Sequence, residues 1–398
     1  MQEILYKLKN VFSSSGSTLI ALVISIILNK FAAINLSEES YALYGQFLLF
    51  STFLMALFTS GLSNNLISSS ISDHKTTVFY TSFGYISVLL VIIFSSKVEK
   101  FFSIQLSLPV YVVLLFLPIV YQLFISVQAV NAKQNNSRDY FLFSIANTVV
   151  GMFIVCLAIS YESYLVLIVA VLIRPGALSF YLIFSGKVAM VRSGEPVKEE
   201  KGYPTPFYLY GFISLMSGII TTGLIRDSLN DSYGFSEMGQ YFAAQRIFEI
   251  MLSLSAAFYS TFYFSNVSKM TFSDAKLYMY RVSITSCILF SLSSLLLNLF
   301  SSELVTLLLS EKQLGAISYF FPLSINLVLN SIGYCSGYLI LSRISKYKVS
   351  LIETLFLIIF CSLSLFFTGT QLIWLMVLIS ASKVILNYII LHFVSDYE

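Results

Sequence analysis

The sequence predicts an all-α polytopic membrane protein with about twelve transmembrane helices in two six-helix bundles. Composition indicates the class, because 57% of the 398 residues are hydrophobic and only 11% are charged. Charged residues make up about a quarter of a soluble domain. The apolar stretches indicate the number of helices, and the distribution of Lys and Arg indicates their orientation. The connections between the stretches are too short to hold a soluble domain with its own chemistry.

Twelve stretches are long enough to cross a membrane, since about 20 apolar residues span roughly 30 Å of hydrocarbon. The first six cover 11–34, 41–69, 77–95, 109–130, 140–160 and 163–185, and the second six cover 207–229, 240–264, 281–300, 317–341, 348–367 and 371–394. Prolines 109, 204 and 206 stand where stretches begin, as expected at helix starts. The first stretch is too long for a signal-peptide core, so we expect it to remain as an anchor.

Lys and Arg set the orientation, because cytoplasmic loops carry an excess of them. With the N-terminus inside, fifteen lie in inner loops and three in outer loops. The other five lie within stretches: Lys30, Arg174, Arg226, Arg246 and Lys383. We therefore expect both termini to be cytoplasmic.

The longest connection covers 186–206, is charged and contains proline, and follows the sixth stretch. It predicts an N-terminal bundle (1–185), a cytoplasmic linker (186–206) and a C-terminal bundle (207–398). Two halves of six spans are typical of transporters built from parallel repeats. No clear repeat is visible at the level of residues, so this symmetry rests on the number of spans.

Two charges lie near the start of the eighth stretch, in "GQYFAAQRIFEI" at 239–250. Arg246 and Glu249 are three residues apart and share one helical face. A charge at the bilayer centre costs at least about 2.5–3.5 kcal/mol, so it faces a partner or a water-filled cavity. Two interpretations stay open. One is a self-neutralised structural pair, and the other is a cavity-lining stripe whose Arg attracts an anion and whose Glu tunes it or carries a proton.

Arg174, in "VLIRPGALSF", lies near the middle of the sixth stretch. Pro175 frees a backbone carbonyl, because it lacks an N–H, and Gly176 allows the kink to open. No acidic residue lies within one helical turn. We expect Arg174 to face a cavity or another span.

Further charges lie in other stretches. Lys383 is midway along the twelfth without a local acid, and Lys30 is near the outer end of the first, where a lysine can snorkel. Glu353 is either a partner of inner-loop lysines or a second candidate proton carrier. Arg226 and Asp227 close the seventh stretch, where a pair at the membrane interface is the favoured interpretation.

The interior is therefore cationic, with five Lys and Arg against two acids. Such an interior suits an anionic cargo, and phosphate or pyrophosphate is the natural partner of Arg and Lys. The predicted substrate site consists of Arg246, Arg174, Lys383 and Lys30, and the candidates for proton or ion coupling are Glu249 and Glu353.

Other residues argue against a metal or cofactor site. The four cysteines are far apart in apolar stretches, and the two histidines are isolated, so neither set has metal-ligand spacing. We expect no cofactor and no metal. A net charge of +3 is too weak to indicate nucleic acid as a partner. In the tenth stretch Asn326, Asn330, Gly333 and Gly337 share one face, and the GxxxG spacing predicts close helix contact.

Three segments resemble the O-antigen flippases, the Wzx-type polysaccharide translocases, which belong to the superfamily that includes MATE-type multidrug exporters. The segments are "NLSEESYALYGQF" (35–47), "GLSNNLI" (61–67) and "GLIRDSLNDSYGFSEMGQYFAAQRIFEI" (223–250). The resemblance covers the whole chain in layout, with degenerate motifs. In that family an outer-face Arg-Asp precedes a Gly-Tyr-Trp run and a basic residue. The positions that match are Arg226, Asp227, Gly239, Tyr241 and Arg246, but "GQYF" replaces Gly-Tyr-Trp and offsets Arg246.

The resemblance implies a V-shaped pair of bundles around a central cavity. It also implies a cargo, an undecaprenyl-pyrophosphate-linked O-antigen or related repeat unit, moved from the cytoplasmic to the periplasmic leaflet of the bacterial inner membrane by alternating access. The cationic cavity would shelter the pyrophosphate while the lipid tail stays among membrane lipids. Proton or sodium coupling is compatible but not required. A polysaccharide polymerase and a chain-length regulator are open as protein partners.

Three alternatives stay open. A multidrug or cation exporter of the same fold should have an acid-rich cavity, whereas cations exceed acids here. A membrane enzyme of polysaccharide assembly, such as a polymerase or acyltransferase, should have a long periplasmic loop or a catalytic His motif. A scaffold protein would leave five interior cations without a purpose. We therefore expect a transporter rather than an enzyme.

Overall fold

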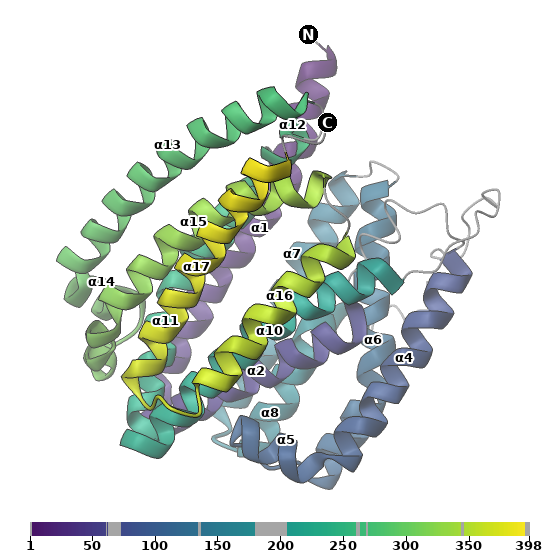
Figure 1. Ribbon diagram of the computed structural model, residues 1–398. Coiled ribbons are helices and arrows are strands. Elements are labelled where there is room, and N and C mark those ends of the chain that lie inside the picture. Colours follow the sequence, from purple (N-terminus) through teal and green to yellow (C-terminus); the bar gives the residue numbers. More distant parts are fainter. Residues whose placement is uncertain are drawn as a thin grey trace. The chain divides into compact units, whose positions relative to one another are not determined.

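The computed structural model describes residues 2–60, 62, 73–133, 137–179, 205–259, 263–267, 270–343 and 346–394. These residues are mainly helical, and none of them lies in a strand (Figure 1). Each predicted stretch contains a helix in its described part. The predicted class, an all-α membrane protein of about twelve helices, is confirmed.

The first six stretches correspond to α1 (Gln2–Asn35), α2 (Glu38–Thr59), α4 (Asp73–Ile93), α6 (Leu108–Lys133), α7 (Ser137–Ser160) and α8 (Tyr164–Ile173). The second six correspond to α10 (Thr205–Tyr233), α11 (Phe235–Phe258), α13 (Phe272–Leu299), α15 (Phe320–Arg343), α16 (Lys346–Leu363) and α17 (Thr370–Val394). The shorter elements are α5 (Ser95–Phe102), the 3-10 turn η1 (Arg174–Gly176), α12 (Phe264–Val267), α14 (Ser301–Leu308) and η4 (Glu311–Tyr319).

Polarity differs among the long helices. Within the described residues, seven helices are long and apolar enough to cross a membrane, or eight if α4 and α5, which meet at an 82° bend, form one span. Helices α11 and α16 are not among them, because Arg246 and Glu249 interrupt α11 and Glu353 follows two lysines in α16. Both acidic candidates therefore lie on helices outside this set of seven.

The N-terminal unit, Met1–Ile220, is built around α2 and α6. Helix α2 packs against α4, α6 and α8, while α6 packs against α4, α7 and α8, and α1 lies along α7. Large aromatic side chains of α2 are fully buried, among them Tyr41, Phe47 and Phe50. Burial of such side chains supplies much of the packing energy of a helical core.

The break in the sixth stretch is tied down by its neighbours. Residues Arg174–Gly176 form η1 instead of continuing α8. The Ser51 hydroxyl donates to the Val171 carbonyl at 3.4 Å, four residues before the proline. The Asn147 side chain donates to the Pro175 carbonyl at 3.1 Å and accepts from the Leu178 N–H at 3.0 Å. The backbone groups left without helical partners at this break are thus satisfied by side chains of α2 and α7.

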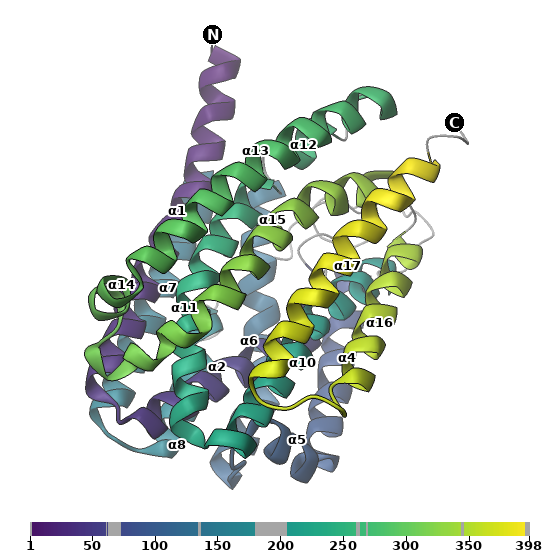
Figure 2. The ribbon, with the colours of Figure 1, turned by 60° about the vertical axis from the view of Figure 1, so that its left-hand side comes forward.

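The C-terminal unit, Thr221–Glu398, is built around α15. This helix packs against α11, α13 and α17, and α16 packs on α17 and α15. Figures 1 and 2 show α13, α15 and α17 side by side. The predicted close contact occurs at Gly333, where an added Cβ would lie 3.4 Å from Val384 of α17, while Gly337 has open space. Only the first glycine of the GxxxG pair therefore faces a neighbouring helix closely.

The two units repeat one packing pattern that the sequence does not reveal. In each unit the third span packs on the fourth (α4 on α6, α13 on α15), and the fourth packs on the second and the sixth. A short helix follows the third span in both units, namely α5 and α14. This repetition supports a chain made of two halves of the same architecture.

The units divide within α10, between Ile220 and Thr221. The first part of α10 packs in the N-terminal unit, where Tyr208 donates to the Leu57 carbonyl at 3.1 Å and its ring lies 4.6 Å from that of Phe83. The predicted boundaries placed α10 from residue 207 onward in the second bundle. Residues 186–204 of the predicted linker lie outside the described residues, so the linker stays a prediction.

Candidate functional site

Arg246 and Glu249 form an ion pair on α11. The Arg246 Nη1 and Glu249 Oε2 atoms are 2.6 Å apart, and the side chains are 22% and 35% exposed. Their spacing of three residues places them on one face of the helix. The pairing is therefore the one that the sequence spacing indicates.

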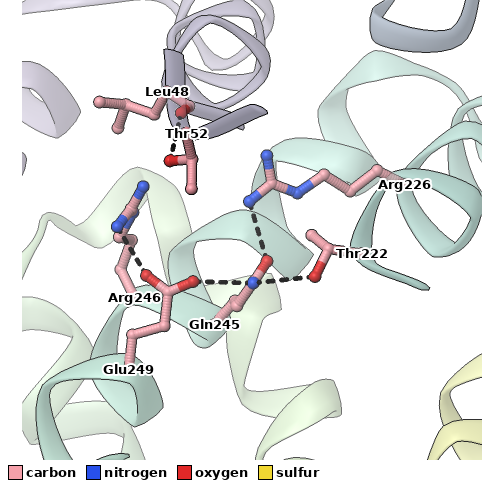
Figure 3. A network of polar contacts seen from close by, with 7 residues as sticks. All are labelled: Leu48, Thr52, Thr222, Arg226, Gln245, Arg246 and Glu249. Atoms are coloured by element: carbon pink, nitrogen blue, oxygen red, sulfur yellow. Dashed lines mark hydrogen bonds and ion pairs between the residues drawn. The ribbon is translucent and has the colours of Figure 1, made fainter. Parts of the chain in front are cut away.

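Gln245 extends this pair into a network that reaches α10 (Figure 3). Its Nε2 donates to Glu249 Oε1 at 2.8 Å, and its Oε1 accepts from Arg226 Nη2 at 2.8 Å. The same Nε2 lies 3.5 Å from the hydroxyl of Thr222. The orientation of the amide follows from its partners, because a guanidinium can only donate and a carboxylate can only accept.

Arg226 is the largest fully buried side chain in the described part of the protein, with 2% of its surface exposed. Its guanidinium carbon lies 4.8 Å from the centroid of the Phe242 ring, and that of Arg246 lies 5.0 Å from the same centroid. Such contacts stabilise a cation by roughly 0.5–2 kcal/mol. Phe242 thus supports both arginines of the network.

Lys383 and Glu353 form a second ion pair, between α17 and α16. Lys383 Nζ lies 2.5 Å from Glu353 Oε1 and 2.6 Å from Oε2, and the side chains are 37% and 14% exposed. Lys383 therefore has an acidic partner on the neighbouring helix, although it has none nearby in sequence. Glu353 pairs with this interior lysine rather than with the lysines of an inner loop.

The remaining two predicted cations belong to the N-terminal unit. Arg174 lies in η1, half-buried, and its side chain packs closely against Gly151 of α7, where an added Cβ would lie 2.9 Å from Arg174 Cγ. Lys30 lies half-buried on α1 next to the buried Asn29. Lys30 and Arg174 each make contacts of their own. Neither belongs to the two ion pairs of the C-terminal unit.

Sequence reasoning missed the hydrogen bond between Arg226 and Gln245 and the ion pair between Glu353 and Lys383. Each of these contacts connects the two helices of a helical hairpin. Arg226 stands eight residues before Gly234, where α10 turns into α11, and Gln245 stands eleven residues after it. Residues at similar distances from such a turn lie at similar heights in antiparallel helices. Counting residues from the turn was therefore the signal that could have predicted these contacts.

Neither a scan against protein-family models nor a search of curated proteins finds a match. Solved structures do match. One is described as the inward-facing conformation of a multidrug resistance MATE family transporter of the MOP superfamily, with 13% identity, a TM-score of 0.61, and coverage of 94% of this chain and 97% of that one. An outward-facing structure described in the same terms gives 14% identity, a TM-score of 0.62, and coverage of 98% and 97%.

This chain has the MATE transporter fold. A third similar structure, from Pyrococcus furiosus, is described as a MOP superfamily transporter whose reversed pocket polarity suggests a different function, with 12% identity, a TM-score of 0.58, and coverage of 96% and 95%. At these identities the likeness shows the fold alone. Together with the apolar helices, the MATE fold makes the chain a multi-pass membrane protein.

Proposed function

We propose that this protein flips an undecaprenyl-pyrophosphate-linked O-antigen or related repeat unit from the cytoplasmic to the periplasmic leaflet of a bacterial inner membrane, by alternating access. One observation carries the choice of cargo. The two bonded clusters in the C-terminal unit hold three cations, Arg226, Arg246 and Lys383, and the last two are partly exposed. Cations that a bound molecule can reach favour a cargo that carries phosphate.

Exposure assigns different roles to these cations. Arg246 and Lys383 are 22% and 37% exposed and can reach a bound molecule. Arg226 is 2% exposed and acts on the cargo only through its field and its hydrogen bond to Gln245. Arg174 and Lys30, from the N-terminal unit, complete the proposed set of cargo-binding residues.

A multidrug exporter is the second candidate, because the inward- and outward-facing neighbours are described as multidrug resistance transporters. A cationic drug would need a carboxylate to bind. Glu249 already accepts from Arg246 and Gln245, and Glu353 already pairs with Lys383. A drug would have to displace a built-in cation from either acid. The description of the Pyrococcus furiosus neighbour fits the view that the polarity of the site varies within this fold.

Ion coupling belongs to the same proposal. Glu249 and Glu353 are the acids available for a proton or sodium ion, and each would bind it only after parting from its cation. Transport that continues unchanged in vesicles without a proton or sodium gradient would remove both from this role.

The direct test is reconstitution of the full-length protein in vesicles with a fluorescent, short-chain polyprenyl-diphosphate-linked sugar. We expect the probe to become accessible to a membrane-impermeant quencher faster with protein than without it. The uncharged polyprenyl-linked sugar should gain no such acceleration. Efflux of a cationic dye, with no movement of the diphosphate probe, would favour the exporter instead.

A test in the host separates the flippase from an enzyme of polysaccharide assembly. After deletion of the gene, we expect completed lipid-linked repeat units to accumulate in the cytoplasmic leaflet and surface polysaccharide to be lost. If single repeat units still reach the outer leaflet but stay unjoined, the protein acts in polymerisation and the proposal is wrong.

A further inference from the structure

The cation of α11 that is best placed to bind cargo is already occupied. Arg246 Nη1 donates to Glu249 Oε2 at 2.6 Å, so a phosphate that binds this nitrogen must replace Glu249 on it. A partly buried carboxylate that loses its only partner carries a desolvation penalty. The proposed function therefore requires a second interaction that stabilises Glu249 when Arg246 leaves it.

Gln245 meets that requirement. The two carboxylate oxygens of Glu249 have separate donors, since Oε2 accepts from Arg246 and Oε1 accepts from Gln245 at 2.8 Å. If Arg246 turns to a phosphate, Glu249 keeps the Gln245 hydrogen bond. Phe242 still supports the guanidinium of Arg246, whose carbon lies 5.0 Å from the ring centroid.

Arg226 holds Gln245 in the orientation that this exchange needs. Its Nη2 donates to Gln245 Oε1 at 2.8 Å, which leaves the amide Nε2 facing Glu249. A flipped amide would turn its oxygen toward the carboxylate and its N–H toward the guanidinium, so both contacts would become repulsive. The hydrogen bond from a buried cation also polarises the amide and strengthens its donation to Glu249.

We propose that Gln245, held by Arg226, is a positioning residue that lets Arg246 exchange Glu249 for a phosphate group of the cargo. The inference rests on the proposed function and deepens it, because it makes the site selective for anions that can compete with a carboxylate. Gln245 stays on Glu249 throughout the exchange. No covalent bond forms or breaks.

The test measures binding of inorganic pyrophosphate and of farnesyl diphosphate to the full-length protein in detergent micelles. Gln245→Leu should weaken binding of both by about tenfold or more, since the exchange would strand Glu249. Glu249→Gln should bind at least as tightly as the parent, because Arg246 then has no carboxylate to leave. The double variant Gln245→Leu/Glu249→Gln should regain the affinity of Glu249→Gln.

Rescue in the double variant separates positioning from a structural role. If Gln245→Leu merely disturbed the fold, removal of the Glu249 charge would not restore binding, and this result would overturn the inference. Gln105→Leu, at an exposed glutamine between α5 and α6, is the same substitution outside the network and should leave affinity unchanged. All variants are compared by melting temperature and by elution as a single species.

The outcomes also separate the inference from the proposed function. A parent protein that binds neither diphosphate contradicts both. A parent that binds, with affinity lost in Arg246→Ala but kept in Gln245→Leu, leaves the proposed function standing and overturns the exchange. Binding of pyrophosphate without any gain from the farnesyl chain identifies the phosphates, rather than the lipid, as the recognised group.

Discussion

At the scale of single residues, the two acids of the predicted coupling set differ in how they are held. Glu249 accepts from a cation and an amide on its own helix, whereas Glu353 pairs with a lysine from the next helix. Removal of Arg246 therefore changes a local cluster, and removal of Lys383 changes a tie between two helices. The two sites call for different experiments.

Arg246→Ala should abolish most transport of the diphosphate-linked probe while the protein still inserts into the membrane. The substitution removes the partly exposed guanidinium of Arg246 but leaves α11 with a strong helix former. Arg246→Lys should keep part of the activity, because a lysine retains the charge but cannot form a bidentate contact with phosphate. Transport is followed in vesicles and insertion by the amount of protein in the membrane fraction. Equal transport by both variants and the parent removes Arg246 from the site.

Glu353→Gln should destabilise the C-terminal unit by ~2 kcal/mol, because Lys383 loses a charge-assisted bond in a partly buried position. The exchanged pair Glu353→Lys/Lys383→Glu should recover most of that loss, since the two helices again hold opposite charges at the same place. Melting temperatures of the solubilised variants measure the effect. If Glu353→Gln melts with the parent, the pair contributes nothing to the packing of α16 on α17.

The sequence identified the charged residues of both clusters but only one of their pairings. Arg246 and Glu249 are close in the sequence, so helical spacing alone joins them. Arg226 and Lys383 find their partners on neighbouring helices, Arg226 across the turn at Gly234 and Lys383 across the turn at Gly369. Both glycines have positive φ, 90° and 54°, a conformation suited to glycine. Spacing within one helix could not reveal these contacts because it does not contain the hairpin register.

At the scale of elements, the break after α8 is a built feature rather than a flexible kink. An added Cβ at Gly176 would lie 2.5 Å from Val120 Cγ1 of α6. The glycine thus allows close packing of η1 on α6, whereas the sequence suggested that it opens the kink. The side chains that satisfy the freed backbone groups come from α2 and α7. The sequence of the sixth stretch alone could not predict these contacts.

Gly176→Ala should destabilise the N-terminal unit by about 1–3 kcal/mol, the usual range for overpacking a tight contact. Asn147→Ala should cost a similar amount, because the Pro175 carbonyl and the Leu178 N–H would lose their partner inside the protein. Gly337→Ala, at a glycine with open space, is the control and should melt with the parent. A Gly176→Ala protein as stable as this control would show that η1 and α6 adjust freely.

At the scale of the whole molecule, composition and charge predict the class and number of spans well, because both follow from the transfer of side chains out of water. The repeated packing of the two units was not predictable in this way. The same pairs of helices pack together in both units although the sequences of the two units differ. The repeat is therefore visible in the structure and not in the amino-acid sequence. The identity of the cargo is harder still to predict from such patterns, since it depends on a few bonded side chains.

Orientation is the prediction that belongs to this scale. Fifteen Lys and Arg lie in the loops predicted to be inside against three outside, so both termini should be cytoplasmic and α5, with the exposed Lys97 and Lys100, should be periplasmic. A cysteine placed at Lys97 should react with a membrane-impermeant maleimide in intact cells, and one placed at Lys348 should react only after permeabilisation. The four native cysteines are first replaced by serine or alanine and transport is checked. The reverse pattern of labelling would invert the chain in the membrane and, with it, the direction of transport proposed here.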